Sequence, residues 1–224
     1  MQPPVKFRFR AVLFDLDGTL VDSAPDLAGA ANFLRTERAM PPLPLESLRP
    51  WASHGARGLI GAALGIKPED DDYAELQQAF LDHYSRTLAD QSRVFDGIEE
   101  TLARLEAAGV AWGVVTNKAM RFAAPLMQAM GLATRAGVLV AGDTLAVAKP
   151  HPGPLLHAAA QLGAATADCA YVGDDERDVI AGRAAGMVTV AAAYGYCSGH
   201  NPDDWQPDLV VSAPSQLITA LTRI

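Results

Sequence analysis

The sequence predicts an α/β fold in which a parallel sheet is covered by helices on both faces. Short, Val-rich apolar runs alternate with amphipathic segments of helical spacing. One long stretch, residues 23–91, breaks this rhythm, because it contains helical segments and no convincing strand. Strands that are apolar throughout are typical of a sheet buried on both sides. We therefore expect a Rossmann-like, doubly wound core that carries a helical cap inserted after the first strand.

The core elements follow one another in βαβα order. The expected strands cover residues 11–14, 110–115, 137–141, 169–172, 188–192 and 209–211. The expected helices cover residues 98–108, 120–130, 154–162, 177–185 and 215–223. A glycine follows four of these helices, where a left-handed residue ends a helix most easily: Gly109, Gly131, Gly163 and Gly186.

The cap is expected to consist of three helical segments, at residues 25–38, 45–64 and 69–89. On this reading the core comprises residues 1–22 and 92–224, and the cap residues 23–91. Ligands of open α/β sheets bind at the carboxyl ends of the strands. Because the insertion begins just after the first strand ends, the cap should lie over that edge as a lid.

Composition and charge narrow the function classes. The chain has 224 residues, half of them hydrophobic, and a net charge of −8 from 26 acidic and 18 basic residues. Nucleic-acid binding needs a concentrated basic surface, which this chain lacks. We expect no nucleic-acid partner, and a monomer or homodimer that binds a small molecule.

Targeting and redox features point to the cytoplasm. The basic residues Lys6, Arg8 and Arg10 precede only four apolar residues, too few for a signal peptide or a membrane span. The only cysteines, Cys169 and Cys197, form no metal-ligand spacing. Two inert thiols in a reducing compartment are expected rather than a disulfide.

The most informative motif is Asp15-Leu16-Asp17-Gly18-Thr19, placed where the first strand ends. A turn at Asp17 brings both carboxylates to one pocket. Such a pair binds a hard cation and divides nucleophilic from acid–base chemistry. The alternative is an Asp-Gly turn with capping residues, which the full five-residue string after an apolar strand disfavours.

This motif resembles the first motif of the haloacid dehalogenase-like hydrolase superfamily. Three further motifs of that superfamily follow in order at predicted strand ends: Thr116-Asn117, Lys149-Pro150, and Gly173 to Asp178. Alone, each is typical of a turn, a loop lysine or a helix N-terminus. Together they cover residues 11–186 and are specific.

The resemblance implies a phosphatase that uses Mg²⁺ and forms an aspartyl-phosphate. Asp15 is the expected nucleophile, and Asp17 the acid that protonates the leaving oxygen and then the base that activates water. Mg²⁺ is expected on the Asp15 carboxylate, the Asp17 backbone carbonyl and Asp174. These roles make a small phosphate monoester the expected substrate.

The remaining motif residues are expected to support this chemistry. Thr116, Asn117 and Lys149 would stabilise charge on the phosphoryl oxygens. Asp178 would hold Lys149 or assist the metal through water. Asp175 stands where this superfamily often has Ser or Thr, which leaves its role open.

The helical insertion resembles the cap of the phosphoglycolate phosphatase-like branch. Other segments, such as Phe95-Asp96-Gly97, resemble N-acetylmuramic acid 6-phosphate phosphatases equally well. The expected substrate is therefore 2-phosphoglycolate or N-acetylmuramic acid 6-phosphate. In the cap, His54 is expected to contact substrate or to be an exposed loop residue. Arg57 is expected to clamp a substrate carboxylate or to lie on the surface.

Two other functions compete with hydrolysis. A phosphosugar mutase of the same superfamily shares the machinery and protects the intermediate from water. A receiver domain forms an aspartyl-phosphate in a doubly wound α/β fold without turning over substrate. The Asp-x-Asp-Gly-Thr string, the distant second acidic cluster and the large lid disfavour the receiver domain.

Overall fold

A six-stranded parallel sheet forms the core of the computed structural model, which describes residues 7–223. In spatial order its strands are β5 (Leu139–Val140), β4 (Ala111–Val115), β1 (Ala11–Phe14), β6 (Cys169–Gly173), β7 (Val188–Ala192) and β8 (Leu209–Val211). Every neighbouring pair is parallel. The predicted fold class is confirmed, and each predicted strand overlaps an observed one.

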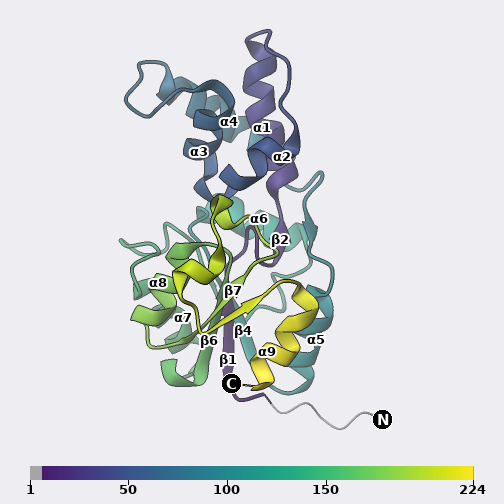
Figure 1. Cartoon of the computed structure of the whole chain (residues 1–224), viewed down its shortest axis with the longest axis vertical. Coiled ribbons are helices and arrows are strands. Elements are labelled where there is room, and N and C mark those ends of the chain that lie inside the picture. The colour runs from purple at the N-terminus through teal and green to yellow at the C-terminus, as the bar shows by residue number, and fades with distance from the viewer. Residues whose placement is uncertain (1–6, 224) are drawn as a thin grey trace.

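Helices cover both faces of the sheet (Figure 1). One layer consists of α5 (Ile98–Ala107), α6 (Met120–Ala129) and α9 (Leu217–Arg223); the other of α7 (Gly153–Gln161) and α8 (Glu176–Ala184). Strand β1 shows why two layers are needed. Its residues Val12 and Phe14 pack with the first layer, whereas Ala11 and Leu13 pack with the second. All four are fully buried, as expected for a central strand with two apolar faces.

A second group of helices stands at the end of the sheet toward which β1 runs (Figure 1). It comprises α1 (Ala24–Glu37), α2 (Leu45–Leu48), α3 (Gly55–Leu64) and α4 (Tyr73–Thr87). These helices bury a second apolar cluster, to which α1 contributes Leu27 and Leu34, and α4 contributes Phe80 and Tyr84. Phe122 and Tyr196, outside the cap, complete it. Below, "cap" means these helices and the loops between them.

The helical segment predicted at residues 45–64 is present but consists of three consecutive pieces. A short 3₁₀ helix, Arg49–His54, separates α2 from α3. Pro50 has no N–H to donate within an α-helix, which breaks the hydrogen-bond ladder there. Gly55 then turns the chain with a φ of 57°, a conformation that glycine adopts without strain.

Two short strands that the sequence did not predict connect cap and core. Strand β2 (Val21–Asp22) pairs antiparallel with β3 (Arg93–Val94). The chain therefore enters and leaves the cap at neighbouring points. In the described part of the chain, no helix has both the length and the apolar character needed to cross a membrane.

Candidate active site

A cavity of about 210 Å³ lies between the carboxyl ends of the strands and the cap. Its core lining consists of Asp15, Asp17, Thr116, Asn117, Lys118, Lys149, Asp175, Arg177 and Asp178. Its cap lining consists of Leu27, Ala52, Ser53, His54 and Gly55. The cavity forms here because β1 has β4 and β6 as neighbours, so the loops after three adjacent strands meet. Most residues predicted from sequence therefore come together.

Asp15 and Lys149 form the centre of the cavity floor. The Lys149 ammonium lies 3.0 Å from Asp15 Oδ1 and 2.7 Å from Asp178 Oδ1. It also donates to the Tyr171 hydroxyl at 2.8 Å. Burial disfavours its charge, but Asp15 and Asp178 outweigh burial and raise the pKa of Lys149. Burial likewise raises the pKa of Asp15 to about 6, against the attraction of Lys149. Asp178 therefore contacts Lys149 directly, which is one of the two roles predicted for it.

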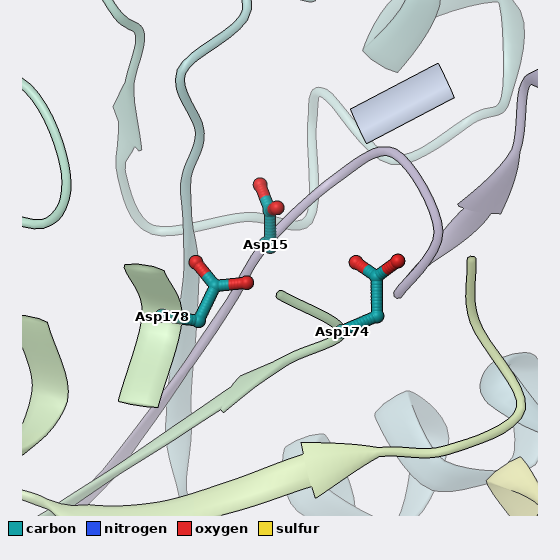
Figure 2. A group of neighbouring side chains, drawn as sticks. All are labelled: Asp15, Asp174 and Asp178. Carbon is teal, nitrogen blue, oxygen red and sulfur yellow. The ribbon is translucent and has the colours of Figure 1, made fainter. Parts of the chain in front are cut away.

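Three carboxylates are close enough to share one metal ion. One oxygen each of Asp15, Asp174 and Asp178 lies within 4.8 Å of the others. Figure 2 shows their origins: Asp15 follows β1, Asp174 follows β6, and Asp178 belongs to α8. Burial, together with the charges of Asp15 and Asp178, raises the pKa of Asp174 well above its ordinary value. A cation among them relieves that repulsion, and carboxylate oxygens are the ligands that hard divalent cations prefer, so these residues fit a metal site.

Two glycines leave the space that the Asp174 side chain occupies. A Cβ on Gly18 would lie 2.1 Å from Asp174 Oδ2, and one on Gly195 would lie 2.3 Å from Asp174 Cβ. Gly18 also has a φ of 80°, which disfavours other residues. The carboxylate accepts hydrogen bonds from the Tyr196 N–H at 2.8 Å and the Thr19 hydroxyl at 3.1 Å. These contacts fix Asp174 beneath the cavity.

Asp17 is held by a buried lysine that sequence reasoning did not select. Lys118 Nζ lies 3.0 Å and 3.2 Å from the two carboxylate oxygens of Asp17, and 4.6 Å from the centre of the Tyr84 ring in the cap. Although burial opposes its charge, Asp17 raises the pKa of Lys118. The Ser23 hydroxyl also donates to Asp17. The signal in the sequence was the position of Lys118 directly after the second motif.

Thr116 and Asn117 lie at the end of β4 and differ in their surroundings. The Thr116 side chain lines the cavity and accepts a hydrogen bond from the Lys118 N–H at 3.2 Å. The Asn117 amide instead pairs with the backbone of Lys149: its Nδ2 donates to the carbonyl at 2.9 Å and its Oδ1 accepts from the N–H at 3.0 Å. Asn117 therefore fixes the backbone of the loop that carries Lys149.

Asp175 has a clear structural partner. It caps α8 by accepting from the Arg177 N–H at 3.0 Å, and its carboxylate also binds the Arg177 side chain, with Nε at 2.6 Å and Nη2 at 2.9 Å. Burial opposes the charge, but the hydrogen bonds from Arg177 hold the pKa of Asp175 below its ordinary value. Sequence reasoning did not select Arg177.

The two predicted cap residues occupy different places. His54 lines the cavity, and burial and the nearby Arg177 lower its pKa. Arg57 is exposed and lines a separate hollow of about 780 Å³ on the outside of α3. The cavity above Asp15 does not include Arg57 in its lining, so its position does not support the predicted carboxylate clamp. Arg177 and His54 border both spaces.

Comparison with known proteins gives consistent matches over nearly the whole chain. Residues 9–186 match the model of the haloacid dehalogenase-like hydrolases. A phosphoglycolate phosphatase of Xanthomonas campestris pv. campestris is 48% identical over 93% of this chain and 94% of its own. An N-acetylmuramic acid 6-phosphate phosphatase of Pseudomonas aeruginosa is 44% identical over 97% of each chain.

Solved structures agree with these matches. The crystal structure of a predicted phosphoglycolate phosphatase from Haemophilus somnus superimposes with a TM-score of 0.85 at 28% identity. The match covers 95% of this chain and 98% of the other. The similarity therefore extends over the sheet and the four cap helices alike.

Proposed function

Because the chain belongs to the haloacid dehalogenase-like hydrolases, we propose that it hydrolyses a small phosphate monoester through a phosphoryl group carried on Asp15. The observation that carries the proposal is the arrangement at the strand ends. A half-buried carboxylate faces a cavity, a lysine lies 3.0 Å from it, and a second carboxylate follows two residues later. The cavity is bounded on its other side by the cap.

In the first step, an oxygen of Asp15 bonds to phosphorus while the bond from phosphorus to the leaving oxygen breaks. Asp17 donates its proton to that leaving oxygen, which departs as an alcohol. In the second step, Asp17 takes a proton from water as the water oxygen bonds to phosphorus and displaces Asp15. Lys118 and Ser23 hold the Asp17 side chain for both proton transfers.

Positive charge and hydrogen-bond donors stabilise the phosphoryl group during transfer. Lys149 lies beside Asp15, and the Thr116 hydroxyl lines the same cavity. Asn117 contributes by positioning Lys149. Preorganised groups of this kind account for much of the catalysis in phosphoryl transfer.

Mg²⁺ is the cation that we assign to the carboxylate cluster. Asp15, Asp174 and the backbone carbonyl of Asp17 would hold it, with Asp178 alongside. When bound, the ion offsets phosphoryl charge and orients a phosphoryl oxygen. Carboxylates and a carbonyl provide the oxygen donors that Mg²⁺ requires.

The substrate that we propose is 2-phosphoglycolate or N-acetylmuramic acid 6-phosphate. The support comes from the names of the two relatives, which share 48% and 44% identity with this chain. Both compounds carry a carboxylate in addition to the phosphate. We further propose that residues 23–91 form the specificity-determining cap and that the enzyme acts in the cytoplasm, a reducing compartment that suits the two free cysteines.

Turnover and trapping of the intermediate test the proposal. The wild-type protein should release phosphate from p-nitrophenyl phosphate with Mg²⁺, and EDTA should abolish the release. Asp15→Asn should be inactive, because an amide is a much poorer nucleophile than a carboxylate. Asp17→Asn should accumulate phosphate on Asp15, visible as a mass increase of the intact protein. Activity above a few per cent of wild type in Asp15→Asn contradicts the assignment.

A further inference from the structure

The Arg177 side chain is rigidly anchored at the edge of the cavity. Asp175 binds it through both Nε and Nη2, at 2.6 and 2.9 Å. Asp175 is itself held by the Ser198 hydroxyl, which donates to its Oδ2 at 3.2 Å. A fork-shaped guanidinium that is bound along one edge is fixed in orientation. Arg177 is therefore a preorganised group and not a loose surface arginine.

One edge of this guanidinium remains available. Arginine has five side-chain N–H donors. The Nε donor and the Nη2 group bind Asp175, and Nη2 also donates to the Ser53 carbonyl at 2.8 Å. Within residues 7–223, Nη1 has no hydrogen-bond partner. The side chain is 33% exposed and lines the cavity that contains Asp15. A residue of the cavity lining thus carries a fixed pair of free N–H groups.

A second unpaired donor belongs to another residue of the cavity lining. The Ser53 hydroxyl is screened from solvent and has no hydrogen-bond partner among the described residues. Ser53 lines the same cavity, and its own carbonyl accepts from Arg177. An unpaired hydroxyl in such a place is unfavourable. The Ser53 side chain can rotate about its Cα–Cβ bond, so turning its hydroxyl toward the cavity would let an acceptor bound next to Arg177 satisfy it.

We propose that Arg177, together with the Ser53 hydroxyl, binds a carboxylate on the leaving group of the substrate. This assignment rests on the proposed phosphatase function and specifies its substrate class: phosphate monoesters whose alcohol carries a carboxylate. The site joins core and cap, because Arg177 belongs to α8 and Ser53 to the cap. It replaces Arg57, whose side chain lies outside the cavity, as the group that selects the substrate.

The charges around the cavity favour this assignment. Lys149 lies between Asp15 and Asp178, and Lys118 is paired with both oxygens of Asp17. Those two ammonium groups are thus paired with the carboxylates proposed to carry out phosphoryl transfer. Arg177 is the remaining cation in the cavity lining, and the planar edge of a guanidinium matches the two oxygens of a carboxylate.

Matched substrate pairs isolate the contribution of the substrate carboxylate to kcat/KM. 2-Phosphoglycolate is compared with 2-hydroxyethyl phosphate, and N-acetylmuramic acid 6-phosphate with N-acetylglucosamine 6-phosphate, which lacks the lactyl carboxylate. Both pairs are used because each proposed substrate carries a carboxylate besides its phosphate. In at least one pair, wild-type kcat/KM should favour the carboxylate by about tenfold or more. The measured quantity is this preference.

The variants should separate Arg177 from its neighbours. Arg177→Ala should remove the preference, chiefly by raising KM for the carboxylate about ten- to a hundred-fold while kcat changes little. Ser53→Ala should reduce the preference by a smaller factor. Arg177→Lys keeps the charge without the fork and should retain part of the preference; it also serves if Arg177→Ala does not fold. Arg57→Ala is the matched arginine variant and should leave the preference within about twofold of wild type.

Three results would overturn the inference. In the first, wild type shows no preference in either pair. In the second, Arg177→Ala or Arg177→Lys lowers kcat/KM equally for both members of a pair, which indicates a structural role. In the third, Arg57→Ala removes the preference instead. None of these touches the phosphatase proposal, because turnover of p-nitrophenyl phosphate by wild type and its loss in Asp15→Asn are measured separately.

Discussion

Replacing Lys118 by Met tests the ion pair that holds Asp17. Methionine keeps the length of the side chain and its contact with the Tyr84 ring, but it removes the charge. The two side chains are 8% and 15% exposed, so the variant leaves the Asp17 carboxylate largely buried without a cation. The Ser23 hydrogen bond to Asp17 is retained, which confines the change to the ion pair.

The expected loss of stability follows from this geometry. Removing one partner of a buried pair costs about 3–5 kcal/mol. Since Asp17 lines the cavity and is 15% exposed, we expect the lower end, about 3 kcal/mol. For a chain of this length, each kcal/mol lowers Tm by about 2–4 °C. Lys118→Met should therefore lower Tm by about 6–12 °C.

A double-mutant cycle measured by urea unfolding provides the assay. Lys118→Met combined with Asp17→Asn leaves no unpaired buried charge, so it should be about 2 kcal/mol more stable than the sum of the single changes predicts. Arg38→Met is the matched control. It breaks an exposed pair with Asp72, whose side chains are 37% and 51% exposed, and should cost less than about 1 kcal/mol. Additivity of the Lys118 and Asp17 changes within about 0.5 kcal/mol would refute the reasoning.

Three further predictions concern the metal site and the thiols. Gly18→Ala should lower Tm by at least about 4 °C and abolish activity. The added Cβ would lie 2.1 Å from the Asp174 carboxylate, and the φ of 80° at this position disfavours alanine. Gly29→Ala in α1 is the control: it has open space around it and should leave stability unchanged or raise it. Mg²⁺ at a hundred times its Kd should raise the Tm of wild type by about 5–10 °C. An equal rise in Asp174→Asn would contradict the assigned ligands. Burial raises the pKa of Cys169 to about 11 and that of Cys197 to about 12. Both thiols should therefore stay protonated at pH 8 and react with a disulfide reagent only after denaturation. Rapid reaction of the native protein would count against their burial.

The elements that sequence predicted well are those with a long local signal. Residues 11–14 form a continuous apolar run and residues 188–192 a run interrupted only by Thr189, and the observed strands have those same limits. The pair β2 and β3 escaped prediction because two residues in each strand give no period to detect. The break at Arg49–His54 was missed although Pro50 marks it, since the flanking helical spacing continues on both sides.

The site was predictable to the extent that each residue follows a strand. Asp15, Thr116 and Asp174 take their positions from β1, β4 and β6, so motif order was sufficient to bring them together. The partners of the charged groups depend on tertiary contacts. Whether Arg57 or Arg177 reaches the cavity depends on how the cap sits on the core, and no local pattern encodes that. Lys118 likewise gains its role only when Asp17 and Tyr84 approach from elsewhere.

The antiparallel pair of β2 and β3 makes the whole cap equivalent to one very long hairpin loop. The two ends of that loop pair with each other, Val21 with Val94 and Asp22 with Arg93. The entropy of closing a loop rises with the logarithm of its length, so doubling the insertion costs only about 0.6 kcal/mol. An insertion whose helices bury many apolar side chains, as here, more than offsets that cost. Lids of very different size are therefore exchangeable at this one point, while the order of the strands and the chemistry at their ends stay unchanged.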